Sequence, residues 1–369
     1  MPPYSSPGVY VEEVASGLAP IVGVGTSTAG FIGVDAVFTP PTGVKLCTNF
    51  SEFKKHFGDF VSPVINPKKS ILAHAVYGFF KNGGTRCYVT RVRSAKFQDA
   101  LDEFEAIDEI AIVAAPGCVD EAEQEAIRAH CENMGDRFAI LDGKETADLS
   151  STNLVNTLKP FNSDYAALYF PWIQVYDPAS SANILVPPSG HMAGVYARVD
   201  NQRGVHKAPA NETIFGALDL QYNLSKAKQD GLNPDGINCI RKLNGNIVIW
   251  GARTIGGDAN GEFKYLNVRR YFNYLKESID EGTQWVVFEP NTPELWAQIR
   301  RNITAFLTTE WRQGALFGTT PQEAFFVKCD AENNPPEIRD LGQVVTEVGV
   351  AVVKPAEFVI FQLSQWTQQ

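Results

Sequence analysis

The chain has no surplus of positive charge. Its 369 residues carry 32 Lys and Arg against 42 Asp and Glu, which gives a formal net charge of −10 and a pI near 5.1. A protein that neutralises nucleic-acid phosphates needs basic residues in excess, so this balance argues against a nucleic-acid partner. The local pairs Arg269–Arg270 and Arg300–Arg301 are therefore interpreted as solvated helix faces or as contacts to an acidic protein partner.

Metal and disulfide signatures are also missing. The six cysteines are spread from Cys47 to Cys329 without a C-x-x-C motif, and the five histidines show no ligand spacing such as H-E-x-x-H. We therefore expect no metal, no other cofactor and no disulfide framework. This use of cysteine fits a reducing compartment.

The N-terminus lacks the basic and apolar blocks of a signal peptide, so none is predicted. Residues 14–34 carry no charge and are long enough to cross a bilayer. However, Pro20 and several glycines, serines and threonines interrupt this stretch. We interpret it as a strand, a loop and a buried strand, and we expect no direct membrane insertion.

Catalytic motifs are equally scarce. Residues 142–146 superficially resemble a phosphate-binding loop, but Glu145 follows Lys144 where Ser or Thr is required, and Phe138 stands in place of the upstream glycine. Gly23-x-Gly25 lacks the spacing of a dinucleotide fingerprint, and no G-x-S-x-G elbow occurs. The sequence thus offers no positive support for an enzyme.

What the sequence does contain is helices alternating with short, almost wholly apolar strands. This pattern is typical of a sheet covered on both faces, so residues 20–220 are predicted to form an α/β domain. The expected strands are 21–24, 31–34, 86–92, 110–115, 138–142 and 166–170, and the expected helices are 70–82, 119–134 and one that begins near Ser189.

The C-terminal third predicts a second α/β unit. Strands are expected at 246–250 and 284–288, and a helix is expected over 264–280. The clearest helix of the chain spans 293–313, where apolar residues including Trp296 recur on one side.

Both ends of the chain predict β-strands that belong to no obvious sheet. A Pro-Gly pair opens the alternating stretch 6–14, and strand-like runs follow at 347–353 and 357–363. Free strand edges pair with whichever chain supplies the complement, so these segments invite strand addition between subunits. The alternative is that both arms fold back onto their own domain.

These patterns divide the chain into an N-terminal strand arm, two α/β domains and a C-terminal strand arm. The predicted boundaries are 1–17, 18–236, 237–330 and 331–369.

Five stretches of the sequence together resemble the sheath proteins of contractile bacteriophage tails and tail-like injection systems. The first is the arm Ser6-Pro7-Gly8-Val9-Tyr10-Val11-Glu12-Glu13, and the second is the helix, glycine stop and strand of residues 75–89. The third comprises residues 187–200 and 203–211, the fourth 232–238 and 250–254, and the last 267–270, 277–279, 281–291 and 311–318. Together the five stretches extend over nearly the whole chain in the family's order.

The resemblance implies a structural protein, not an enzyme. Subunits of this family stack as rings around an inner tube in an extended, metastable state, then rearrange as nearly rigid bodies into a shorter, wider one that drives the tube through a target envelope. The arms complete a small sheet in neighbouring subunits. The implied inter-subunit arm residues are Pro7, Gly8, Val9, Tyr10, Val11, Glu12, Val350, Val352, Val359 and Phe361.

The implied partners are other copies of the chain, the inner tube protein, and baseplate and terminal cap proteins. A helix of the C-terminal domain contacts the tube in this family. The candidates here are Trp296, Arg300 and Arg301 on one helix, with Arg269 and Arg270 on a competing one. The resemblance also implies assembly in the cytoplasm of a bacterial producer cell, followed by incorporation into a phage-like particle.

The chain lacks the large inserted domains of some phage sheaths and is not split into two proteins. It is therefore closer to the sheaths of bacteriocin-like or extracellular injection particles and short phage tails, in the main lattice or in a minor ring. Two alternatives stay open. One is a small-ligand enzyme with a site near Gly190–Arg203 that uses His191 or His206, and the other is an adaptor that binds by strand addition alone.

Overall fold

A computed structural model describes residues 20–34 and 43–360. Its centre is an eight-stranded sheet in the order β11-β10-β6-β5-β4-β1-β3-β2, in which β2 and β11 are antiparallel edge strands and the six strands between them are parallel. The strands are β1 (Ala29–Val34), β2 (Lys45–Cys47), β3 (Cys87–Val92), β4 (Ile112–Ala114), β5 (Phe138–Asp142), β6 (Ala166–Phe170), β10 (Ile237–Leu243) and β11 (Asn246–Ile249).

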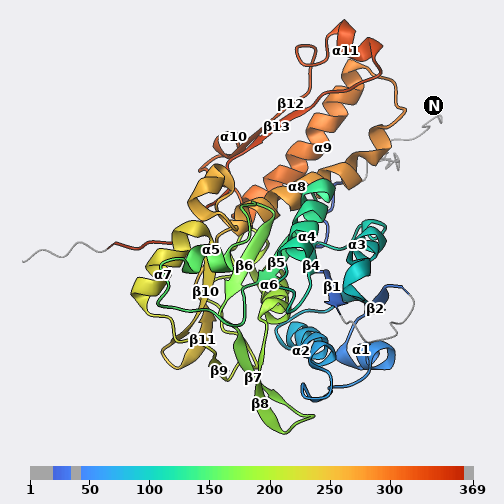
Figure 1. Cartoon of the computed structure of the whole chain (residues 1–369). Helices are drawn as coiled ribbons and strands as arrows, with labels where there is room; N and C mark the ends of the chain where they lie inside the picture. The colour runs from blue at the N-terminus through green and yellow to red at the C-terminus, as the bar shows by residue number, and fades with distance from the viewer. Residues whose placement is uncertain (1–19, 35–42, 361–369) are drawn as a thin grey trace, which may run out of the picture.

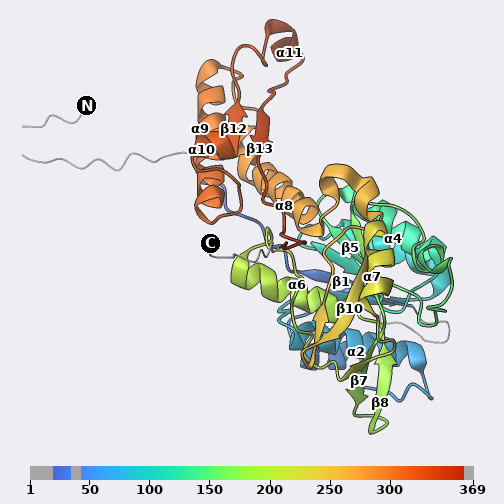
Figure 2. The ribbon, with the colours of Figure 1, turned by 90° about the vertical axis from the view of Figure 1, so that its left-hand side faces the viewer.

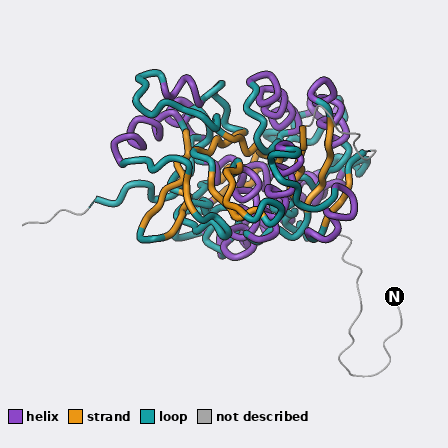
Figure 3. The backbone as a smooth tube through the Cα atoms, turned by 60° about the horizontal axis from the view of Figure 1, so that its bottom comes forward, coloured by secondary structure: helices purple, strands orange, loops and turns teal. Residues whose placement is uncertain are grey.

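Successive residues of the central strands face opposite layers. In β5, Phe138 and Ile140 belong to the core on one side of the sheet, and Ala139 and Leu141 belong to the core on the other. This is why the strands read as continuous apolar runs, and it confirms the predicted α/β class. Figure 3 shows helices surrounding these strands.

Helices cover both faces of the sheet (Figures 1 and 2). One layer holds α1 (Phe50–Phe57), α2 (Pro67–Lys81) and α6 (Ser189–Arg203); the other holds α3 (Phe97–Glu105), α4 (Glu121–Met134), α5 (Leu154–Leu158) and α7 (Lys226–Leu232). A small sheet in the order β8-β7-β9 joins the main body; its strands are β7 (Ile173–Asp177), β8 (Ala182–Val186) and β9 (Asp219–Leu220).

A C-terminal unit projects from one end of this body (Figures 1 and 2). Its own apolar core lies between two long helices and a two-stranded antiparallel ribbon. The elements are α8 (Leu266–Thr283), α9 (Pro293–Arg312), α10 (Pro321–Ala324), β12 (Phe325–Lys328), α11 (Pro336–Asp340) and β13 (Glu347–Val350).

Helices α2 and α6 pack closely because glycines face the contact. A Cβ atom on Gly190 would lie 2.4 Å from the Ala75 Cα atom, and one on Gly194 would lie 2.4 Å from the Phe79 carbonyl oxygen. Real Cβ atoms do not approach other heavy atoms this closely, so only glycine allows the two backbones to meet.

Two predicted strands are wrong. Residues 21–24 form no ladder, because the Val24 amide donates to the Ser278 hydroxyl (3.1 Å) and the segment crosses α8. Residues 284–288 form a 3₁₀ turn over Gln284–Val286 followed by a loop, in which the Val287 and Glu289 amides bond the nearby Gln284 and Val286 carbonyl oxygens and not another strand. Several other elements were not predicted, among them α1, β2, α3, α7, β10, β12 and the β7–β8 hairpin.

The boundary predicted between Gly236 and Ile237 does not coincide with the edge of the sheet. Strand β10 pairs in parallel with β6, and β11 pairs with β10, so both strands belong to the main sheet. We therefore propose that the C-terminal unit begins after β11, close to the start of α8.

We predict that Gly194→Ala lowers the free energy of unfolding by about 1–3 kcal/mol, because the new methyl group meets backbone atoms of α2 that cannot move independently. Urea denaturation measures this. Gly231→Ala in α7 is the matched control: its Cβ meets nothing within 4 Å, so stability should be unchanged or slightly higher. Equal losses in both variants would contradict the packing argument.

Candidate functional site

The ribbon β12–β13 presents open edges. Phe325 lies opposite Val350 and Lys328 opposite Glu347, and in the part of the chain that the structure describes neither strand has a second strand partner. One face packs toward α9 through Phe325, whereas Phe326 on the other face is 52% exposed. A ribbon supported on one face offers two rows of main-chain groups for strand addition.

The structure places part of the predicted C-terminal arm against its own chain. Val350 pairs with Phe325 inside its own chain, and Val352 forms a bridge with Leu316. Both side chains are half-buried against the core of the C-terminal unit, so this portion folds back. The exposed part begins later and includes Val359, whereas Phe361 lies outside the described residues.

The N-terminal candidates Pro7, Gly8, Val9, Tyr10, Val11 and Glu12 also lie outside the described residues. The segment that follows them is held on the C-terminal unit. Ile21 is buried in that core, and its amide donates to Asn302 Oδ1 (3.4 Å). Gly23 lies against the Tyr274 ring, where a Cβ atom would collide with the hydroxyl oxygen.

Arg269 and Arg270, two of the tube-contact candidates, are buried and paired with carboxylates of their own chain. Arg270 forms a bidentate ion pair with Asp200 of α6 (3.0 and 2.6 Å), and each side chain is 3% exposed. It also donates to the Thr26 carbonyl oxygen (3.0 Å). Arg269 pairs with Asp164 and lies over the Phe263 ring (3.5 Å to the centroid).

The other three candidates lie on helix α9 and differ in exposure. Trp296 is buried, and its indole N–H donates to Asn291 Oδ1 (2.8 Å). Arg300 is half-buried and donates to the Cys329 carbonyl oxygen. Arg301 is exposed. It lines a hollow on the outer face of α9 with six other residues, Glu294, Ala297, Gln298, Arg300, Thr304 and Ala305.

The proposed ligand site near Gly190–Arg203 is packed core. These residues lie mainly in α6, and His191 is 2% exposed with its ring against Gly78 of α2. Burial lowers the pKa of His191 to about 3, so its ring is neutral at physiological pH. His206 is half-buried beside Tyr271. In the described part of the chain, neither ring lines the hollow on α9 or the cleft beside α8.

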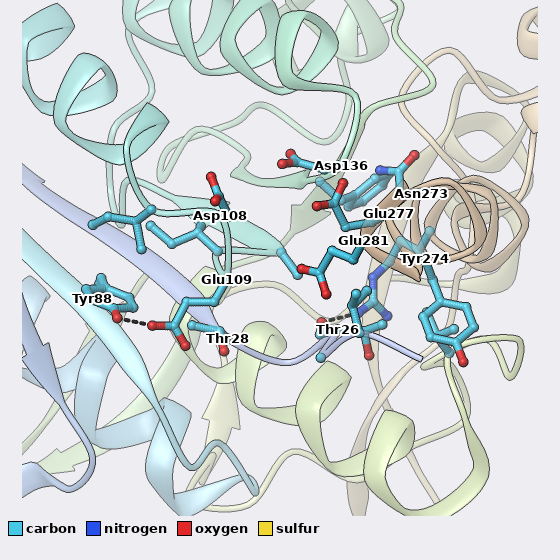
Figure 4. A pocket seen from close by; sticks show the side chains of 18 of the residues that line it. Thr26, Thr28, Tyr88, Asp108, Glu109, Asp136, Asn273, Tyr274, Glu277 and Glu281 are labelled. Atoms are coloured by element: carbon cyan, nitrogen blue, oxygen red, sulfur yellow. Dashed lines mark hydrogen bonds between the residues drawn. The ribbon is translucent and has the colours of Figure 1, made fainter. Parts of the chain in front are cut away.

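A cleft of about 590 Å³ lies between α8 and the amino ends of β1 and β4 (Figure 4). Its walls carry five carboxylates: Asp108, Glu109, Asp136, Glu277 and Glu281. Burial, together with neighbouring carboxylates, raises the pKa of Glu277. Even so, no group of His, Cys, Asp or Glu within residues 20–34 and 43–360 is arranged to hold a metal ion.

The same part of the chain contains no helix with both the length and the apolar character that a bilayer span requires.

Two family models match this chain. The phage tail sheath protein central domain matches residues 91–255, and the phage tail sheath C-terminal domain matches residues 258–365. The break between them falls just after β11, where the main sheet ends.

Solved structures match over the whole length. A chain of the PVC sheath complex, an extracellular contractile injection system in the contracted state, is 30% identical, with 99% of each chain covered and a TM-score of 0.82. The helical sheath of the anti-feeding prophage in the contracted state is also 30% identical, with 98% and 99% covered and a TM-score of 0.78.

Curated relatives match over shorter regions. The tail sheath protein of Vibrio phage KVP40 is 30% identical over 204 residues, which cover 54% of this chain and 29% of that protein. A putative prophage major tail sheath protein of Pseudomonas aeruginosa is 25% identical over 267 residues, which cover 69% and 65%.

Fold and sequence thus define a structural component of contractile tail-like particles. The chain belongs to the contractile tail sheath family, which confirms the resemblance.

We predict that Asp200→Asn lowers the free energy of unfolding by about 3–5 kcal/mol, because it leaves the Arg270 guanidinium buried without a counter-ion. Thermal and urea denaturation measure this. Asp59→Asn removes a carboxylate from an exposed pair with Lys54 and should change stability by less than about 1 kcal/mol. A loss of less than 1 kcal/mol in Asp200→Asn would show that the buried pair does not hold α8 on α6.

Proposed function

We propose that this chain is the structural subunit of a contractile sheath. It polymerises as stacked rings around an inner tube and contracts from a metastable extended state to drive the tube through a target envelope. The observation that carries the proposal is the open ribbon β12–β13 in a chain that has strand-forming segments at both ends. One chain supplies the edge and another supplies the strand.

Main-chain pairing suits a joint that must stay connected while the bodies move. The backbone donors and acceptors of an edge pair with an added strand largely independently of its side chains. The tether can therefore turn at its unpaired residues while the ladder stays intact. The free energy of contraction then comes from new contacts between bodies, and no nucleotide is needed.

The proposed partners are other copies of this chain, an inner tube protein, and baseplate and terminal cap proteins. One structural match, 29% identical with a TM-score of 0.78, is a chain of the anti-feeding prophage baseplate. We propose assembly in the cytoplasm of a bacterial producer cell and incorporation into a phage-like particle. The near-complete overlap with sheath chains of injection systems favours a particle of that kind.

The outer face of α9 is the proposed tube contact. Glu294, Ala297, Arg301 and Ala305 follow helical spacing along one side, so the small residues let a partner approach closely while Arg301 offers a charge. Trp296 is buried on the other side of α9, in the core of the C-terminal unit.

The two other functions make different predictions. A small-ligand enzyme would be a discrete monomer or dimer, and the burial of His191 removes one of its two candidate bases. A strand-addition adaptor would be a stable monomer that orders its arms only on contact with a partner. Negative-stain electron microscopy of the protein, alone and with a tube protein, distinguishes these two functions from the sheath function, which predicts striated cylinders.

We predict that deleting residues 1–15, or replacing Val9 and Val11 with proline, abolishes long assemblies and leaves the body folded. Proline removes the N–H groups that a ladder requires. Electron microscopy and circular dichroism measure the two effects. The double replacement of Val9 and Val11 with threonine keeps these N–H groups and should still assemble. Intact tubes from the deletion would show that the N-terminal strand is not the tether.

We also predict that Arg301→Glu still forms hollow sheaths but loses tube filling by about tenfold or more, because the charge at the centre of the α9 face is reversed. Co-expression with the tube protein followed by counting filled and empty particles measures this. Lys228→Glu on exposed α7 makes the same charge change elsewhere and should fill normally. Normal filling in Arg301→Glu would exclude this face as the contact.

A further inference from the structure

The side chain of Glu357 is bound to the main body by four hydrogen bonds. Its Oε1 atom accepts from Asn233 Nδ2 (2.7 Å) and Arg253 Nε (2.8 Å), and its Oε2 atom accepts from an Arg253 terminal nitrogen (2.8 Å) and the Tyr265 hydroxyl (2.9 Å). Both carboxylate oxygens are thus fully used. Burial alone would raise the pKa of Glu357, but these donors hold it below its usual value, so the group is ionised at neutral pH.

The receiving side of this contact is rigid. Arg253 is 4% exposed, and its remaining terminal nitrogen donates to the Asn233 carbonyl oxygen (3.1 Å) and to Asp258 (3.0 Å). Its backbone N–H and C=O both bond the side chain of Asn238 in β10. A fully bonded guanidinium on a fixed backbone binds a carboxylate in one orientation, which a flexible lysine would not do.

The contacts that the chain makes with its own body change at Glu357. Upstream, the Val353 amide still bonds the Ala315 carbonyl oxygen (3.4 Å), and Lys354 and Ala356 are exposed. Downstream come three consecutive apolar residues that the single chain does not cover: Phe358 (70% exposed), Val359 (68%) and Ile360 (82%). Figure 1 shows this segment leaving the body near α7, which Asn233 follows in the chain.

Three exposed β-forming residues follow directly after a carboxylate whose oxygens are both hydrogen-bonded. This arrangement indicates that the C-terminal segment leaves the main body at a fixed position. We propose that Glu357, held by Arg253, Asn233 and Tyr265, is the anchor that sets where the C-terminal segment leaves the body to pair with a second copy of this chain. The anchor rests on the proposed sheath function, because a second copy must supply the edge. Glu357 is a positioning residue: it sets the geometry of the tether without forming part of the added strand.

The anchor limits the length of the free C-terminal segment. If Glu357 were released, residues 354–357 would join the free segment, which at about 3.3 Å per residue adds roughly 13 Å of reach. Neighbouring bodies would then no longer be held at one separation. The ladder itself could still form, so release should disturb the order of an assembly more than its existence.

The first test measures the anchor in the unassembled full-length protein. All six cysteines are buried, so a nitroxide on Ala356→Cys labels one exposed site. Adding Glu357→Gln should shorten the rotational correlation time of the label on the order of threefold, because the bidentate contact is lost. Lys354→Ala, an exposed control in the same segment, should leave the mobility unchanged. Equal mobility in all three proteins would overturn the anchor.

The second test measures assembly without the label. Glu357→Gln should lower the unfolding midpoint of the body less than Asp200→Asn does, because Arg253 keeps its ion pair with Asp258 (3.0 Å). It should give sheaths with irregular ring spacing, visible as weakened layer lines in electron micrographs, while Lys354→Ala should match the parent. Ordered Glu357→Gln sheaths, despite a mobile label, would overturn the link between anchor and tether and leave the sheath function standing. Failure of the parent itself to form cylinders would instead overturn the proposed function, and the inference with it.

Discussion

The ion pair between Arg270 and Asp200 is the constraint on which the joint between the two parts of the chain depends. It places a helix of the C-terminal unit against α6 of the main body, and Thr26 binds both partners, donating to the carboxylate (2.7 Å) and accepting from the guanidinium. Removing two charges from water costs much of what their attraction returns, so the pair adds little net stability. Its effect is geometric, because a bidentate contact tolerates one orientation of the two helices.

Under the proposed function the subunit moves within a lattice, and a fixed joint then has consequences. The α6 side of the joint is itself held by glycine-mediated contact with α2, and α2 packs on the central sheet. The C-terminal unit is therefore connected to the sheet through close contacts with no flexible linker in between. A body of this kind moves as one piece, and the free edges of β12–β13 then move with it. Under the proposed function, contraction as a rearrangement of nearly rigid bodies requires this property.

The sequence predicted the sheet and the long helices, because buried strands and an amphipathic helix leave periodic apolar patterns. Helix α9 begins at Pro293 as expected and ends one residue early. The prediction failed where the partners are distant side chains. The run 21–24 has β-forming residues, yet its amides bond Ser278 and Asn302. Likewise, Arg269 and Arg270 look like a solvated pair, but their carboxylates lie 105 and 70 residues away, and no local pattern reveals them.

The positions of the two arm roots follow from the same geometry. The N-terminal root, around Ile21, is bound to the C-terminal unit, whereas the C-terminal root at Glu357 is bound to the main body. The N-terminal arm is thus rooted in the C-terminal unit, and the C-terminal arm is rooted in the main body. Under the proposed function, tension between the arms passes through the joint at Arg270 and Asp200. This ion pair adds little net stability, but it is then the contact that must stay intact when neighbouring subunits exert force on the arms.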